Sequence, residues 1–247
     1  MSHYRWKDIA WRDLWLIPIL AVSLIALNMV ATFVYFIIVQ PDSFSNTTQL
    51  ILSDGYIIAT TIASVISYII VIASFWLLHF RTMPKRFKQG IEGVKTYWKW
   101  ILIAYIATML LSQIYEWLKS FLPSDFQYGT PQNEVLVEEM IHNLSWLPLN
   151  FAFIVILAPI VEEIFFRHLL IGELGKKLNF KIMGIISVIA FAGVHVLDAS
   201  SPFEIIDYLI IAIPVVWLYL KSHRNLGVTI GFHILNNFVA FILGLIF

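Results

Sequence analysis

The stretch Pro159–Arg167 reads PIVEEIFFR and lies inside a run, Leu147–Leu174, that is otherwise almost wholly apolar. Charged side chains in such a run are costly, and they are functional candidates by default. If the run is helical, Glu163 and Arg167 are one turn apart on one face and can pair. Glu162 points about 100° away and has no partner in its own helix. The pattern therefore predicts one carboxylate in a structural pair and one that is free for chemistry.

The composition predicts a membrane protein. The chain has 247 residues, of which 60% are hydrophobic and 13% charged, and its mean hydropathy is +0.81. These values are too apolar for a soluble domain of ordinary composition. We therefore expect one integral-membrane domain over residues 1–247 and no separate soluble domain. The net charge of zero and the lack of a basic tract argue against nucleic acid, and the absence of cysteine excludes disulfides, thiolate metal sites and cysteine nucleophiles.

The apolar runs predict an all-α transmembrane bundle of about seven spans, with six to eight as the range, because about 20 apolar residues cross a bilayer core. The expected spans are Leu14–Val39, Tyr56–Phe80, Ile101–Leu122, Leu147–Leu174, Ile182–Leu197, Phe203–Leu220 and Leu226–Phe247. A short amphipathic pattern near 131–142, with Thr130 and Pro131 at its start, indicates an acidic interfacial helix. That helix could be a solvated loop helix or a substrate lid.

The distribution of lysine and arginine sets the orientation. Almost all of them fall in four segments, which are Arg5–Arg12, Arg81–Lys99, Lys176–Lys181 and Lys221–Arg224. A topology with the N-terminus inside and the C-terminus outside puts all four segments on the inner side, as the positive-inside rule requires. We expect a multi-pass protein of a bacterial plasma membrane.

Three further polar residues lie at span depth: His195 in the fifth span, and His233 and Asn237, four residues apart, in the seventh. Glu162 and His195 each lie fourteen residues, or ~21 Å, above the nearest inner lysine. Asn237 lies thirteen residues, or ~20 Å, above Arg224, and His233 is one turn lower. A lone buried histidine is more often a core residue, and a span asparagine often joins helices. Agreement in depth across three helices favours a site.

The remaining histidines are expected at helix ends or in loops, as interfacial or solvated residues. They are His3, His79, His142, His168 and His223.

Three motifs in this order resemble those of the CPBP family of intramembrane proteases. They are EExxxR at Glu162–Arg167, FxxxH at Phe191–His195 and HxxxN at His233–Asn237. The family includes the type II CAAX prenyl endopeptidases and bacterial Abi proteins linked to bacteriocin processing and self-immunity. The resemblance covers residues 147–240, and the N-terminal half matches only in being hydrophobic spans.

The resemblance implies an endopeptidase whose site lies in a cavity within the helix bundle. Glu162 would be the general base on water, and His195 would help to hold or activate that water. His233 and Asn237 would stabilise the oxyanion, while the pair formed by Glu163 and Arg167 would support the site. This agrees with the residues, because amide hydrolysis without a nucleophilic cysteine needs an activated water, a base and oxyanion donors.

The expected partners are a peptide or lipidated-protein substrate and membrane lipid, with no nucleic acid. The resemblance favours a glutamate-dependent mechanism without a tightly held metal, but the family has also been described as one of metalloproteases, so zinc is the alternative cofactor. Glu162, His195 and His233 would then be three zinc ligands with an open position. Two other functions stay open. One is a non-proteolytic immunity or scaffold protein of the same family. The other is a proton-coupled transporter, since buried Glu and His also form proton relays, although no internal repeat supports it.

Overall fold

A computed structural model of the chain describes residues 4–39 and 53–246. Within these ranges the chain is helical, and no strand is present. Six helical segments are long and apolar enough to cross a membrane, and a seventh apolar helix, of 16 residues, is shorter. The predicted all-α membrane bundle is therefore confirmed. The predicted outer loop after the first span falls largely on residues 40–52, outside the described residues, as do residues 1–3 and the C-terminal residue 247.

The helices follow one another along the chain, and successive long helices run in opposite directions through the bundle. Their bounds are α1 (Leu16–Val39), α3 (Asp54–Leu78), α4 (Met83–Lys119), α5 (Gln132–His142), α6 (Leu147–Phe151), α7 (Ala158–Glu163), α8 (Gly175–Leu178), α9 (Phe180–His195), α10 (Ile205–Lys221) and α11 (Leu226–Ile246). Two π-helical segments, η6 (Ala152–Leu157) and η7 (Ile164–Leu174), join α6, α7 and α8 into one long helix. Short 3₁₀ turns are η1 (Trp6–Asp8), η2 (Trp11–Trp15), η4 (Ser124–Phe126), η5 (Leu144–Trp146) and η8 (Pro202–Glu204).

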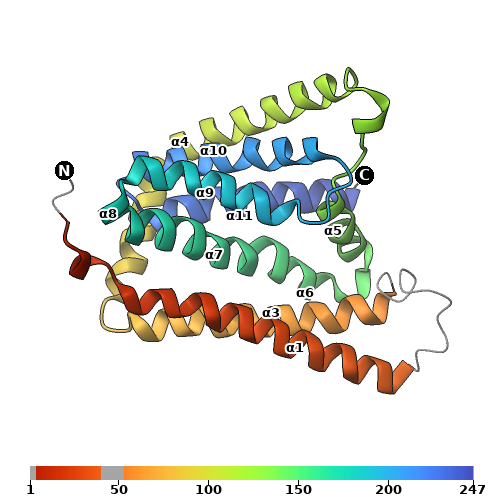
Figure 1. Cartoon of the computed structure of the whole chain (residues 1–247), viewed down its shortest axis with the longest axis horizontal. Coiled ribbons are helices and arrows are strands. Elements are labelled where there is room, and N and C mark those ends of the chain that lie inside the picture. The colour runs from red at the N-terminus through yellow and green to blue at the C-terminus, as the bar shows by residue number, and fades with distance from the viewer. Residues whose placement is uncertain (1–3, 40–52, 247) are drawn as a thin grey trace.

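The bundle is layered around the helix that carries the charged motif. Figure 1 shows α1 and α3 side by side at one edge, α4 at the opposite edge, and the α6–α8 helix between α3 and the layer of α9, α10 and α11. The described N-terminal segment and the C-terminal end of α11 lie at opposite ends of the bundle (Figure 1). The described part of every predicted basic segment lies at the end that holds the N-terminal segment, as the orientation argument requires.

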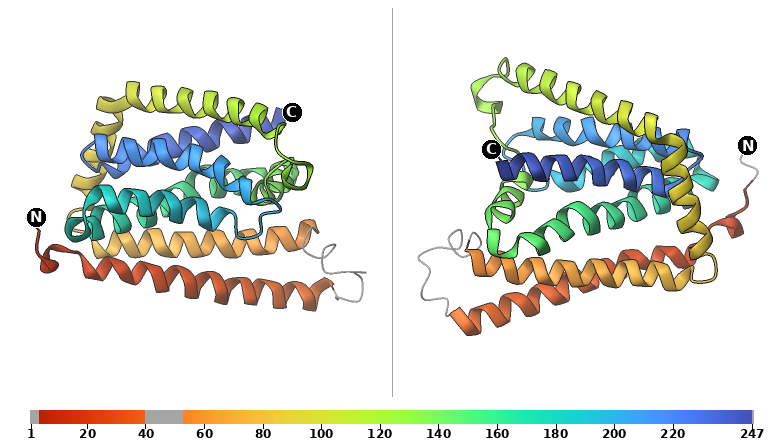
Figure 2. Two further views of the ribbon diagram at one scale, coloured as in Figure 1. Left: turned by 45° about the horizontal axis from the view of Figure 1, so that its top comes forward. Right: turned by 180° about the vertical axis from the view of Figure 1, so that it is seen from behind.

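One boundary differs from the prediction. The third span was expected to begin at Ile101 after a basic loop, but α4 begins at Met83 and includes that basic stretch. Pro84 stands in its first turn, where a missing N–H costs nothing. Figure 2 shows these first turns running across the end of the bundle before the helix turns along it. Hydropathy located the apolar part of α4 and missed its polar beginning. The first turns run across the end of the bundle, where a helix need not be apolar.

Small residues and apolar clusters hold the helices together. At the crossing of α4 and α11, a Cβ added to Gly90 would lie 3.5 Å from Gly227 Cα, so these helices approach almost backbone to backbone. Close packing of this kind replaces the hydrophobic effect as the main attraction between helices in lipid. A buried cluster that includes Val71, Val161 and Ile164 joins α3 to the motif helix.

The predicted interfacial helix is present as α5, one residue later than its expected start, with Pro131 preceding the first turn. Asn150 at the beginning of the next span donates from Nδ2 to the Met140 carbonyl at 2.7 Å, which fastens the end of α5 to α6. The helix therefore has a fixed place at one end of the bundle.

Candidate active site

The two adjacent carboxylates stand on a regular α-helical turn between two π-helical segments. In the first segment, hydrogen bonds join an N–H to the carbonyl five residues earlier, as from Ala158 to Phe153. The next such bond would run from residue 159 to Ile154, but Pro159 has no N–H. Asn237 of α11 supplies the missing donor, with its Nδ2 3.0 Å from the Ile154 carbonyl. The motif helix and α11 are thus joined at the level of the motif.

Glu163 is fully buried and links two other residues of the site. Its Oε2 lies 3.3 Å from Arg167 Nε, which is the predicted pair one turn apart in the same helix. Its Oε1 lies 2.9 Å from His233 Nδ1 on α11. The sequence anticipated the first contact and gave no indication of the second.

Arg167 is also fully buried, and aromatic rings complete its surroundings. Its guanidinium carbon lies 4.7 Å from the centroid of the Phe191 ring, within the range of a cation–π contact. The charge of Arg167 is therefore balanced by Glu163 on one side and by the face of Phe191 on the other.

His233 is positioned by both carboxylates. A carboxylate oxygen accepts hydrogen bonds, so the contact with Glu163 puts a proton on His233 Nδ1. Nε2 then faces Glu162, 3.6 Å from its Oε2. A carboxylate that holds one nitrogen of an imidazole fixes the direction of the other. Glu163 thus aims His233 Nε2 toward Glu162.

His195 is oriented by its own helix and by α10. Its Nδ1 lies 2.7 Å from the Phe191 carbonyl, an acceptor, so that nitrogen carries a proton and Nε2 is left for other partners. The ring is stacked on Tyr208, with centroids 4.9 Å apart and planes inclined by 27°. Two contacts of different kinds therefore limit the rotation of this ring.

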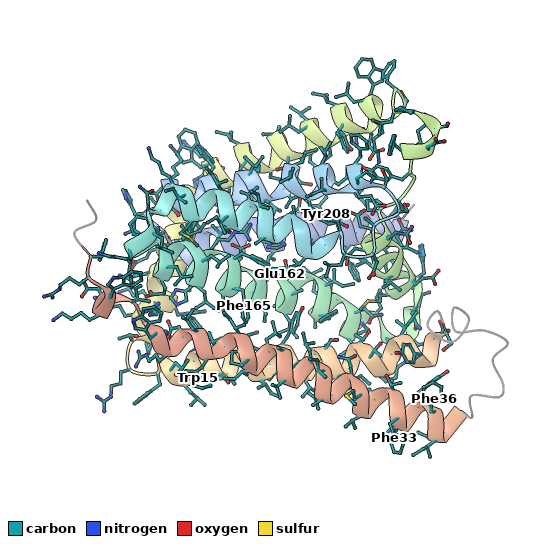
Figure 3. All side chains as sticks on the ribbon, viewed as in Figure 1. Trp15, Phe33, Phe36, Glu162, Phe165 and Tyr208 are labelled. Carbon is teal, nitrogen blue, oxygen red and sulfur yellow. The ribbon has the colours of Figure 1, made fainter. Side chains whose placement is uncertain are left out.

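Glu162, His195, His233 and Asn237 line one cavity of about 970 Å³. The Glu162 side chain is 20% exposed, whereas Glu163 behind it is fully buried. Figure 3 shows Glu162 near the middle of the bundle, with Tyr208 toward α10 and Phe165 toward α1. A cavity in this place can hold water beside a carboxylate, as hydrolysis of an amide requires.

The α5 helix forms part of the cavity wall through Glu134 and Glu138. Glu134 is an exposed residue that faces the cavity, and the protein around the cavity removes part of the hydration of its carboxyl group. This desolvation, followed by the charges of Asp207 and Glu138, raises the pKa of Glu134 to about 7. The loop before α5 is tied to α10, because Tyr128 donates to Asp207 at 2.6 Å.

The proposed zinc ligands do not form a three-ligand site as they stand. Among the described residues, the trio whose ligand atoms all lie within 4.8 Å of one another is Asp13, His79 and His168. His195 and His233 each direct Nδ1 to a protein acceptor, the Phe191 carbonyl and Glu163 respectively. Nε2 of each ring stays available, as it is in metal-binding histidines whose other nitrogen donates to a carbonyl or carboxylate. Zinc binding by Glu162, His195 and His233 stays a prediction, and the mechanism considered below is written for the side chains alone.

Residues 144–239 match the family model described as Type II CAAX prenyl endopeptidase Rce1-like. This segment of the chain is therefore similar to the Rce1-like family. The match is consistent with the resemblance to the CPBP family and supports a CAAX-protease-like membrane protein, and the Rce1-like family is one of intramembrane proteases. The six long apolar helices support an integral, multi-pass membrane protein. Neither a curated protein nor a solved structure gave a match to the chain.

The Rce1-like segment contains all six residues that the sequence singled out. The cavity also has walls from outside it: Tyr68 of α3 and Glu134 of α5 line the same space. Sequence reasoning missed both, and it missed Tyr208, which lies beneath His195. A tyrosine in a span is ordinary, and only the neighbouring helices decide which way it points.

Two predictions about histidines were wrong. His79 and His168 were expected to be interfacial or solvated, but both are buried against Asp13. His79 follows the end of α3 and His168 lies within η7, and Asp13 of the N-terminal segment contacts both of them. His142 and His223 are exposed as expected, and His3 lies outside the described residues.

Proposed function

We propose that this protein is an intramembrane endopeptidase in which Glu162 activates water to hydrolyse a peptide bond inside the bundle. One observation carries the proposal. Four side chains from three helices, a carboxylate, two imidazoles and an amide, line the same cavity. They are the donor and acceptor types that hydrolysis by water needs, and a buried pair behind them supports the carboxylate and one imidazole.

In the proposed first step, Glu162 takes a proton from water while the water oxygen bonds to the substrate carbonyl carbon. His195 accepts the second water proton in a hydrogen bond through Nε2, which its contact with Phe191 leaves available. A positioned general base of this kind contributes roughly 10²–10⁴-fold to rate.

The negative charge that develops on the carbonyl oxygen needs donors. Asn237 uses one N–H on the Ile154 carbonyl and has a second one to offer. His233 can donate through Nε2 when that nitrogen is protonated, with Glu162 and Glu163 compensating the charge of the ring. The C–N bond then breaks, and Glu162 returns its proton to the leaving amine, giving a carboxylic acid and an amine; the acid then passes its remaining proton to the amine or to solvent.

We propose a peptide or lipidated protein as the substrate. Apolar side chains of η2 and α1, namely Leu14, Ile17 and Leu20, form one wall of the cavity. A wall of this kind suits a substrate with an apolar or lipid-bearing segment beside the scissile bond, reached from the membrane.

The test is Glu162→Gln in the purified full-length chain, with a prenylated CAAX reporter peptide as the first substrate. We expect cleavage to fall by at least about 100-fold. Glu139→Gln is the matched control, because it makes the same chemical change on α5 at an exposed residue that does not line the cavity. Both variants should keep the helical content and size-exclusion profile of the unchanged protein.

A second arm covers other substrates. Peptide profiling of membranes that contain the unchanged protein or Glu162→Gln should reveal new termini only with the former. Persistent cleavage by Glu162→Gln contradicts the proposal. A cellular phenotype that survives Glu162→Gln, with no new termini, would favour an immunity or scaffold role instead.

A further inference from the structure

Three side chains that commonly bind metals meet at the basic end of the bundle, outside the cavity. Asp13 belongs to η2, His79 is the C-cap that directly follows α3, and His168 belongs to η7. Their exposed fractions are 0%, 4% and 6%. None of the three lines the cavity of Glu162.

Their ligand atoms converge on a single carboxylate oxygen. Asp13 Oδ2 lies 2.9 Å from His79 Nε2 and 2.8 Å from His168 Nε2. Because the carboxylate is an acceptor, both rings donate to it through Nε2 in this arrangement. The three atoms lie within 4.8 Å of one another.

Among the described residues, the Asp13 carboxylate has an oxygen without a hydrogen bond and, apart from the two histidines, only an exposed arginine as its ion-pair partner. Its second oxygen, Oδ1, is buried and receives no hydrogen bond from a described residue. The nearest cationic atom is Arg12 Nε at 3.8 Å, on a side chain that is 60% exposed. Buried carboxylates are stable when they are paired or bind a metal. A cation on this carboxylate would supply charge that two neutral imidazoles cannot.

We propose that Asp13, His79 and His168 bind a divalent transition metal of the zinc class. Two imidazoles and a carboxylate are donors that zinc accepts, usually with tetrahedral geometry. In a tetrahedral site with metal–ligand bonds of about 2.0–2.1 Å, neighbouring ligand atoms lie roughly 3.3 Å from one another. The present nitrogen–oxygen separations would have to widen by about half an ångström. The fourth position is left for Asp13 Oδ1 or a water.

If both imidazoles are neutral, metal binding moves the proton of each ring from one nitrogen to the other, and neither ring loses its proton. Each ring gives its Nε2 lone pair to the metal and carries its proton on Nδ1 instead. His79 Nδ1 now lies 3.5 Å from Arg12 Nη2, and two donors cannot face each other there. Arg12 would turn away, which its exposure permits. The centroid of the Phe75 ring lies 4.9 Å from that of His79 and 5.1 Å from that of His168. Phe75 therefore forms an apolar wall beside both imidazoles.

The metal would act as a clamp for the N-terminal segment. That segment is already bound to the end of the motif helix, since Ala10 N–H donates to Glu173 Oε2 at 2.7 Å and Lys176 Nζ donates to the Asp8 carbonyl at 3.0 Å. His168 directly follows Arg167, so a metal here would also stabilise the helix that supports Glu163. The inference is independent of the proposed peptidase activity.

The experiment uses the full chain in detergent, stripped with a chelator and reloaded with zinc chloride. We expect one equivalent of zinc per chain after desalting, by elemental analysis. His168→Gln and Asp13→Asn should lose this equivalent. His142→Gln, the same change at an exposed histidine, should keep it. Glu162→Gln should also keep it, which separates this site from the cavity.

Cobalt gives a readout that does not depend on variants of the site. Co²⁺ added to the stripped protein should produce the visible absorption of a four-coordinate nitrogen and oxygen site, unchanged in Glu162→Gln and removed by zinc. The proposal is overturned if the unchanged protein gives neither the zinc equivalent nor this spectrum. It is equally overturned if folded His168→Gln retains the metal, or if Glu162→Gln loses it.

Discussion

Glu163 and His233 are joined across two helices by a contact of 2.9 Å between Oε1 and Nδ1. The same carboxylate is paired with Arg167, so one buried group both neutralises an arginine and orients an imidazole. This gives the two adjacent glutamates different surroundings. Glu163 is enclosed by protein, and Glu162 faces the cavity with His233 Nε2 beside it.

Replacing Glu163 should destabilise the fold strongly. Glu163→Gln leaves Arg167 fully buried without its counter-charge, and breaking a buried pair in this way costs about 3–5 kcal/mol. The free energy of unfolding in detergent measures the loss. Glu139→Gln should change it little. The double variant Glu163→Gln/Arg167→Met should recover part of the loss, and equal stability of Glu163→Gln and Glu139→Gln would refute the expectation.

The hydrogen bond from Asn237 to Ile154 should be coupled to Pro159. Asn237→Ala removes the side-chain donor of a part-buried carbonyl, at a cost of about 0.5–1.5 kcal/mol. Pro159→Ala provides an N–H five residues after Ile154, so the same Asn237→Ala change should cost less in that background. A double-mutant cycle on unfolding free energies measures the difference. Additive losses would show that the proline and the asparagine act independently.

The ring of Tyr208 should matter to catalysis through His195. Tyr208→Leu removes the stacked ring, a contact of about 0.5–1.5 kcal/mol, and should lower kcat by roughly two- to twelvefold. Tyr208→Phe keeps the ring and should retain most of the rate. The measurement is kcat on the same reporter peptide. A Tyr208→Phe variant as slow as Tyr208→Leu would assign the effect to the hydroxyl instead.

Glu134 should make stability depend on pH. Its pKa is raised from 4.5 to about 7 in the folded protein. The folded state therefore binds the proton more tightly than the unfolded state. The resulting stabilisation is complete below about pH 4.5 and is lost as the pH rises toward 7. Relative to Glu134→Gln, the unchanged protein should lose stability across this window.

The midpoint of thermal unfolding between pH 4 and 8 tests this expectation, with Glu139→Gln as the matched control on the same helix. A constant difference between the unchanged protein and Glu134→Gln over the whole range would show that Glu134 has no raised pKa.

Several features of the fold follow from local sequence. Hydropathy located the spans, because a bilayer imposes a length and a composition on each helix separately. The pairing of Glu163 with Arg167 followed from a four-residue spacing within one helix. Depth, counted from the basic ends, placed Glu162, His195 and Asn237 at one level, and these side chains do line one cavity. Their catalytic roles stay predictions until Glu162→Gln is assayed.

The sequence by itself thus determined which segments are apolar helices and that Glu162, His195 and Asn237 lie at one level along them. Only the tertiary structure decided which residues face one another, since that depends on helix rotation and tilt. Asp13 meets His79 and His168 across 66 and 155 residues of chain. No spacing rule connects positions so far apart. His168 also lies in a π-helical segment, where the α-helical period no longer predicts the direction of a side chain.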